Sequence, residues 1–143
     1  MAGKATPAYG RRWLMPPQAQ TSEVRVLTVD DQEVFRRVAE DVIAATPGFV
    51  VAGEAASGDD ALDAVERLAP QLVLCDVRMP GLDGIEVARR LAATHPETVV
   101  VLISLGDRAD LPAALLLGDT VPLVRKQDFG PVLLRRLWRE HGH

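Results

Sequence analysis

The chain of 143 residues contains a single cysteine, Cys75. One thiol cannot form a disulfide within the chain, and this excludes the small disulfide-rich domains of secreted proteins. Cys75 lies inside a short apolar run, where we expect a small buried core residue rather than a reactive thiol. The cysteine content therefore fits a protein of the reducing cytoplasm.

Long hydrophobic stretches and an excess of basic residues are missing as well. No apolar run approaches the roughly 20 residues that a membrane-spanning helix needs, and the N-terminus lacks the apolar segment of a secretory signal. The formal net charge of −4 argues against a nucleic-acid-binding surface. We therefore expect that this chain itself binds neither a membrane nor a nucleic acid.

The length fits one domain with enough residues to bury its own core. Residues 1–22 contain Gly, Pro and Gln but no apolar periodicity. We expect these residues to form a disordered leader and residues 23–143 to form the folded domain.

Five short apolar segments alternate with segments whose apolar residues recur at helical spacing. The expected strands are 24–29, 49–55, 72–76, 98–104 and 121–124. Most are too apolar to have a face in water, and Pro122 in the last one suggests an edge position. The pattern predicts an α/β fold, a doubly wound five-stranded parallel sheet flanked by helices on both faces.

Local signals predict where the helices begin and which faces they bury. Ser57, Asp83 and Asp128 have the positions of N-caps. The first helix is expected to run to about Thr46, because five apolar residues recur there at helical spacing: Val34, Phe35, Val38, Val42 and Ile43.

Polar residues follow four of the expected strands. Asp30 and Asp31 follow the first strand, Asp76 ends the third, Ser104 ends the fourth and Lys126 lies just past the fifth. Carboxyl ends of parallel strands meet at one edge of a sheet, so these side chains should converge on one crevice. Carboxylates bind a hard cation such as Mg²⁺, a lysine and a hydroxyl hold phosphoryl oxygens, and a carboxylate can attack phosphorus. The set predicts a phosphoryl-transfer site.

Each acid alone has a simpler interpretation. Asp76 can merely open the turn at Pro80-Gly81, and Asp30 or Asp31 can cap the following helix. The agreement of four strand ends favours the joint functional interpretation. A small phosphatase with an aspartyl nucleophile is an alternative of another class, but neither strand-end acid begins an Asp-x-Asp pair.

Over residues 24–141 the sequence resembles the receiver domain of two-component response regulators, especially receivers that precede LuxR-type (NarL-type) DNA-binding domains. The resemblance rests on the pair Asp30-Asp31, the run DVRMPGLDG from Asp76 to Gly84, Ser104 and Lys126. It implies the strand order 2-1-3-4-5. It also implies a signalling domain that accepts a phosphate, rather than an enzyme.

The resemblance assigns a role to each of these residues. Asp76 would accept phosphate from a histidine kinase, and Ser104 and Lys126 would contact the phosphoryl group. The implied cofactor is Mg²⁺, with these ligands: Asp31, Asp76, the backbone carbonyl of Arg78, and Asp30 through water.

Three positions depart from the family pattern. Leu105 stands where receivers usually have a small residue beside the phosphate, Leu123 occupies the position of the usual switch aromatic, and Gln127 rather than proline follows Lys126. These departures concern the coupling of phosphorylation to surface change more than the acceptor chemistry. They keep open the alternative of a pseudo-receiver that binds partners without phosphorylation.

The last predictions concern output, that is, the partner to which the domain would pass its signal. Leu115-Leu116-Leu117, Leu123 and either Leu137 or Trp138 are expected to form an apolar patch for a homodimer or another protein partner, on the face made by the fourth helix, fifth strand and fifth helix. The chain ends soon after the last expected helix. It can therefore be a stand-alone receiver or the truncated N-terminal part of a DNA-binding response regulator.

Overall fold

The computed structural model describes residues 23–106 and 121–142. The strands of this part are β3 (Val24–Val29), β4 (Phe49–Ala55), β5 (Leu72–Asp76), β6 (Val99–Ser104) and β7 (Leu123–Arg125). Its helices are α2 (Glu33–Ala44), α3 (Gly58–Leu68), α4 (Gly84–Thr94), the short 3₁₀ helix η2 (Lys126–Asp128) and α6 (Pro131–His141).

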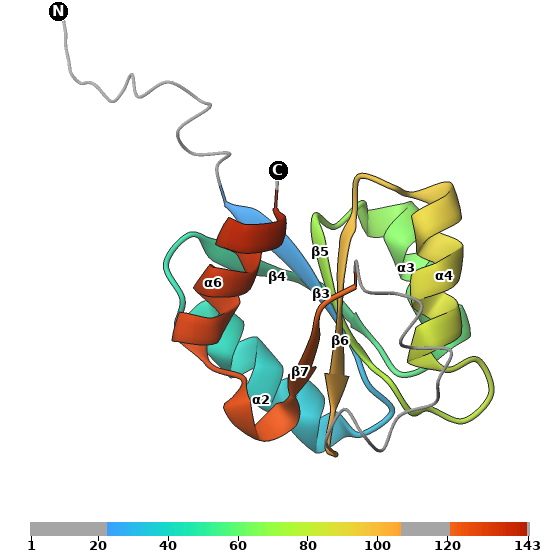
Figure 1. The fold of residues 1–143 in the computed structure, drawn as a ribbon, viewed down its shortest axis with the longest axis horizontal. Coiled ribbons are helices and arrows are strands. Elements are labelled where there is room, and N and C mark those ends of the chain that lie inside the picture. Colours follow the sequence, from blue (N-terminus) through green and yellow to red (C-terminus); the bar gives the residue numbers. More distant parts are fainter. Residues whose placement is uncertain (1–22, 107–120, 143) are drawn as a thin grey trace, which may run out of the picture.

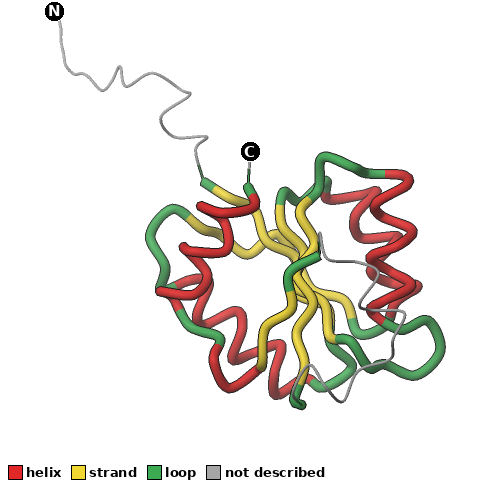
Figure 2. The backbone as a smooth tube through the Cα atoms, in the orientation of Figure 1, coloured by secondary structure: helices red, strands yellow, loops and turns green. Residues whose placement is uncertain are grey.

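All strand pairs are parallel, and the order across the sheet is β4-β3-β5-β6-β7. Numbered along the chain, this is the expected order 2-1-3-4-5, and β7, which follows Pro122, is an edge strand. Helices α2 and α6 cover one face of the sheet and α3 and α4 cover the other (Figure 1). Figure 2 shows the strands as a central layer between the helices. The predicted doubly wound fold is confirmed.

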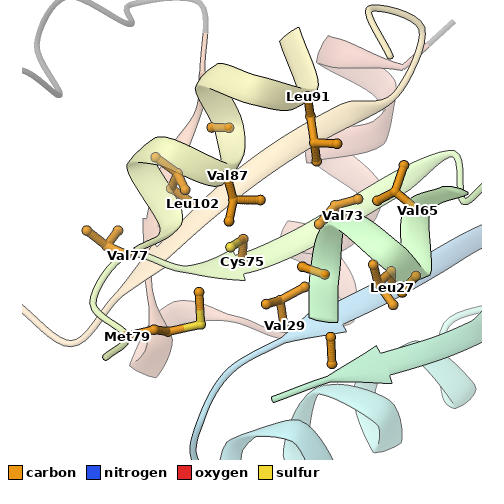
Figure 3. Close-up of a cluster of buried hydrophobic side chains, with 14 residues drawn as sticks. Leu27, Val29, Val65, Val73, Cys75, Val77, Met79, Val87, Leu91 and Leu102 are labelled. Carbon is orange, nitrogen blue, oxygen red and sulfur yellow. The ribbon is translucent and has the colours of Figure 1, made fainter. Parts of the chain in front are cut away.

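Each face of the sheet has its own hydrophobic core. On the α3/α4 side, Leu27, Val29, Val73 and Cys75 of the sheet meet side chains of both helices (Figure 3). On the α2/α6 side, the second cluster joins Val26, Leu74 and Ile103 of the sheet to Ala39, Ile43 and Leu134 of the helices. Burial on both faces explains why β5 consists entirely of buried residues. Burial, followed by the neighbouring Asp76 charge, raises the pKa of the Cys75 thiol, as expected for a core cysteine.

Two of the predicted N-caps are confirmed. The Ser57 side chain accepts a hydrogen bond from the Asp60 backbone N–H at 3.1 Å, and Asp83 accepts one from Glu86 at 2.9 Å. The helices α3 and α4 therefore begin where the sequence places them, directly after β4 and after the turn that follows β5.

The predicted N-cap of the last helix is wrong, and the apolar stripe of α2 is only partly buried. Asp128 does not cap the last helix: it belongs to η2 and pairs with Arg125 at 3.1 Å, while α6 starts at Pro131 with Gly130 as its N-cap. In α2, the side chains of Val34 and Val38 are exposed, with exposed fractions of 76% and 47%. Ala39 and Ile43 fill the core instead.

The expected leader (1–22) and the leucines Leu115–Leu117 lie outside the described residues. Within the described ranges, no helix is long and apolar enough to cross a membrane.

Candidate functional site

Three carboxylates meet at the carboxyl edge of the sheet. Asp30 and Asp31 directly follow β3, and Asp76 is the last residue of the neighbouring strand β5. One oxygen from each lies within 4.8 Å of the others. The structure therefore brings together the three acids that the sequence placed at strand ends.

The first two acids have different surroundings. Asp30 is buried, with an exposed fraction of 1%, and its Oδ1 accepts a hydrogen bond from the Gln32 N–H at 2.8 Å. Its Oδ2 is 2.6 Å from Lys126 Nζ, in a buried ion pair. Asp31 is exposed. Asp31 is thus the acid that a ligand reaches directly, whereas Asp30 is buried against the lysine.

Neither acid caps α2. The N-cap of that helix is Gln32, which makes no side-chain capping bond. Helix capping therefore does not account for the acidic pair, although both acids lie just before the N-terminus of α2, where negative charge is favourable.

Lys126 supplies the positive charge of the site. It follows β7 as the first residue of η2, and its Nζ lies 3.7 Å from Asp76 Oδ2 as well as beside Asp30. The ammonium also stands 4.6 Å from the centre of the Phe35 ring, within the range of a cation–π contact. Phe35 is thus a site residue, although its sequence position predicted only that it belongs to the apolar stripe of α2. Its place in the first turn after the acidic pair was the available signal.

Among the described residues, the Asp76 carboxylate has two further carboxylates and the Lys126 ammonium near it. Burial raises the pKa of Asp76 to about 6, and the charge of Asp30 adds to the increase. Lys126 and the backbone N–H of Arg78 act in the opposite direction. The raised pKa thus reflects mainly the loss of water around the carboxylate, which Lys126 and the Arg78 N–H offset only in part.

The β5–α4 turn approaches Asp76 without space for a side chain. Gly84, the first residue of α4, donates its N–H to the carbonyl of Val77 at 2.9 Å. A Cβ atom at Gly84 would overlap the backbone carbonyl of Asp76. The glycine therefore lets α4 begin directly against the strand end that carries the carboxylate.

A cleft of about 580 Å³ opens over Asp76. Ser104, at the buried end of β6, borders this cleft, and its Oγ accepts a hydrogen bond from the Gly106 N–H at 3.1 Å. Leu105 is 75% exposed on the rim. The wall contains polar and apolar side chains: Asp31, Gln32, Val34, Phe35, Val38, Asp76, Arg78, Ser104, Leu105, Gly106, Lys126 and Gln127. Every polar residue predicted for the site except the buried Asp30 thus borders one cleft.

Residues 26–129 match the family model of the response regulator receiver domain. This chain belongs to the receiver domain family. The receiver domain is the signalling module of two-component systems, and it is not itself a catalytic domain. Its family normally binds Mg²⁺ at an acidic site and interacts with histidine kinases.

Relatives and solved structures agree with this assignment. The chain is 42% identical over 106 residues to protein-glutamate methylesterase/protein-glutamine glutaminase 5 of Myxococcus xanthus, covering 73% of this chain and 30% of that protein. It is 38% identical over 93 residues to the response regulator GacA of Pseudomonas viridiflava, covering 65% and 44%. The receiver domain of the regulator NarL from Mycobacterium tuberculosis superposes with a TM-score of 0.71 at 31% identity, over 83% of this chain and 95% of that one. The chain spans less than half the length of the two curated relatives.

Proposed function

We propose that Asp76 is the residue phosphorylated by a histidine kinase. The observation that carries this proposal is the position of Asp76: it lines the cleft, with one oxygen within 4.8 Å of two further carboxylates and its Oδ2 3.7 Å from an ammonium. A nucleophile for phosphoryl transfer needs this combination of access and neighbouring positive charge.

In the transfer, one Asp76 carboxylate oxygen attacks the phosphorus of a phosphohistidine. An O–P bond forms, the N–P bond breaks, and its electron pair returns to the imidazole of the kinase. The lysine is placed to follow the charge, since Lys126 Nζ lies between Asp30 and Asp76 and can contact a phosphoryl oxygen without leaving the site. The Ser104 hydroxyl, which still has a donor available, would bind a second oxygen.

The same residues fit a bound Mg²⁺. We assign Asp31, Asp76 and the Arg78 carbonyl as its direct ligands, and Asp30 as a ligand through water. The clustering of the acids, the exposure of Asp31 and the burial of Asp30 support this division. When bound, the cation would neutralise charge on the phosphoryl oxygens.

The assignment of Asp76 as the phosphorylated residue is tested by measuring the mass of the protein. The full chain is incubated with acetyl phosphate and Mg²⁺, and the intact mass is measured. The wild type should gain one phosphate, Asp76→Asn should gain none, and Asp59→Asn, which changes an exposed acid of α3, should behave as the wild type. An Asp76→Asn variant that is labelled like the wild type, or a wild type that is never labelled, contradicts the assignment.

We also propose that the kinase docks beside the cleft on the exposed side chains of Val34, Val38 and Leu105. These three apolar residues border the cleft over Asp76, so a protein that brings a phosphohistidine to Asp76 has to cover them. The double variant Val34→Ser/Val38→Ser should slow transfer from a kinase that phosphorylates the wild type. Labelling by acetyl phosphate should not change. Equal loss with both donors would assign the valines to the site itself.

Only part of the expected apolar output patch can lie on the surface. Leu137 is buried at 4% exposure, and it therefore cannot contribute to a surface. Trp138 and Leu123 are half-buried against the two cores, and the remaining leucines lie outside the described residues. A homodimer through this face and a DNA-binding partner domain remain proposals about the whole protein, as does a role without phosphorylation.

A further inference from the structure

Arg36 connects the acidic pair to the neighbouring edge strand. From the first turns of α2, its Nη1 donates to the backbone carbonyl of Asp30 at 2.8 Å, and its Nε donates to Glu54 Oε1 of β4 at 2.5 Å. The Arg36 side chain is only 15% exposed. Because a guanidinium is planar and presents its donors in a fixed arrangement, the two contacts together define the position of the Asp30 carbonyl.

An irregularity in the sheet places Glu54 on the correct face for this contact. The pairing of β3 with β4 shifts by one residue between Val26 and Leu27, so that Thr28 lies opposite Glu54. Side chains alternate along a strand, and without the shift Glu54 would point to the α3/α4 face. Such bulges occur next to functional sites, where they redirect a side chain. Here the shift turns Glu54 toward α2.

We propose that Arg36, fixed by Glu54, is a positioning residue that holds the Asp30-Asp31 backbone in the geometry needed to bind Mg²⁺. The inference rests on the proposed function, since it assigns a role in the same site. Arg36 does not border the cleft over Asp76. It acts through the backbone of the residue before Asp31, the acid assigned as a direct ligand.

Charge and position predict opposite effects of removing Arg36. If the guanidinium acted only through its charge, its loss would leave the acidic site more negative and would strengthen Mg²⁺ binding. If it positions the acidic pair, its loss should weaken binding despite the lost repulsion. The sign of the change in affinity therefore distinguishes the two roles.

Mg²⁺ affinity of the full chain is measured by calorimetry, at a temperature where circular dichroism shows each variant folded. Arg36→Ala should bind Mg²⁺ about tenfold more weakly, the range seen when residues behind metal ligands are removed. Arg37→Ala is the matched control, since it removes the same charge from the next residue, whose partner is Glu33 on the exposed side of α2. It should bind as tightly as the wild type or slightly more tightly. Arg36→Lys should recover only part of the loss, because one ammonium does not reproduce two fixed donors.

Glu54 supplies the second arm of the test. Glu54→Ala should weaken Mg²⁺ binding less than Arg36→Ala, and the double variant should be no weaker than Arg36→Ala alone, because Glu54 acts through the guanidinium. With acetyl phosphate, the variants should need more Mg²⁺ for half-maximal labelling but approach the wild-type maximum. Tighter or unchanged binding by Arg36→Ala overturns the positioning role while leaving Asp76 as the acceptor. A wild type that binds no Mg²⁺ overturns the proposed function itself.

Discussion

The two ends of the parallel strands are held in place by different chemistry. The amino edge is the side of the sheet where the strands begin, and the carboxyl edge is the side where they end. At the amino edge, polar groups are satisfied by short contacts: Arg25 Nη1 donates to the Ala69 carbonyl at 2.8 Å, and the Arg25 N–H donates to Gln71 Oε1 at 2.9 Å. There, His95 and Glu66 also join the ends of α4 and α3 at 2.7 Å. At the carboxyl edge, Asp30 and Asp76 are buried with like charges close together and one lysine between them.

The amino edge contributes to stability, whereas the carboxyl edge carries the candidate functional site. The contacts at the amino edge pair donors with acceptors on exposed or half-exposed side chains. The carboxyl edge buries carboxylates, and burial raises the pKa of Asp76 in spite of the neighbouring Lys126. A cation that enters such a site offsets the buried negative charge.

The largest effect is expected where the carboxyl edge is packed most closely. Gly84→Ala places a Cβ against the Asp76 carbonyl, so the strand end or the start of α4 has to move. Alanine is otherwise the better helix former, and without the overlap the variant would be more stable. We expect a loss of about 2–4 kcal/mol in the free energy of unfolding, together with slower phosphorylation. Urea denaturation measures the first and intact-mass labelling the second.

The control for this variant is Gly130→Ala. A Cβ there would have no heavy atom within 4 Å, apart from the neighbouring residues of its own chain segment. The change should cost less than about 1 kcal/mol, the effect of a poorer N-cap for α6. Equal losses in the two variants would show that the approach of α4 to Asp76 is not specially tight.

The second effect concerns pH and has a defined sign. The pKa of Asp76 is near 6 in the folded protein, above its ordinary value of 3.8, so between these values the folded state holds a proton that the unfolded state has lost. The contribution of this group to the free energy of unfolding therefore falls as the pH rises from about 4 to about 6, and it stays low at higher pH. Without Mg²⁺, Asp76→Asn should be more stable than the wild type by about 2 kcal/mol at pH 7.5 and nearly equal to it at pH 4.

Urea denaturation in EDTA at the two pH values measures this difference. Mg²⁺ should narrow the difference at pH 7.5, because it stabilises the wild type more than the variant. A variant that is less stable than the wild type at pH 7.5 in EDTA would mean that Lys126 compensates fully for the buried charge.

The sequence predicted most of the fold and most of the site, because both depend on local patterns. Strand β4 has the predicted bounds, and Ser57 and Asp83 cap α3 and α4 as their positions indicated. The parallel arrangement then brings Asp30, Asp31 and Asp76 together. No long-range information is needed beyond the rule that parallel strands share their carboxyl edge.

What the sequence did not predict depends on contacts between distant segments. The helical stripe of α2 was wider than its contact with the sheet, so periodicity alone did not show that Ala39 is buried while Val34 and Val38 border the cleft. The Arg36–Glu54 pair joins residues 18 apart, and it depends on a register shift for which Gly53, inside β4, was the available local signal. Asp128 does not cap the last helix, because it belongs to a 3₁₀ turn that ends before α6 begins.

The smallest effect is expected at the amino edge. Glu66 lies near the end of α3 with its side chain 69% exposed, and the His95 ring beside it is 21% exposed. This contact is a hydrogen bond, and an ion pair only while His95 is protonated; with one partner largely in water it contributes at most about 1 kcal/mol, because the solvent screens it and both side chains lose freedom. Glu66→Ala should therefore lower the free energy of unfolding by less than about 1 kcal/mol and leave phosphorylation unchanged. Glu97→Ala, an exposed acid of the following loop with no ion pair within the described ranges, is the control and should show no effect. A loss above about 2 kcal/mol for Glu66→Ala alone, measured by urea denaturation, would show that this pair fixes α3 against α4, and the amino edge would then carry more of the stability than its exposure indicates.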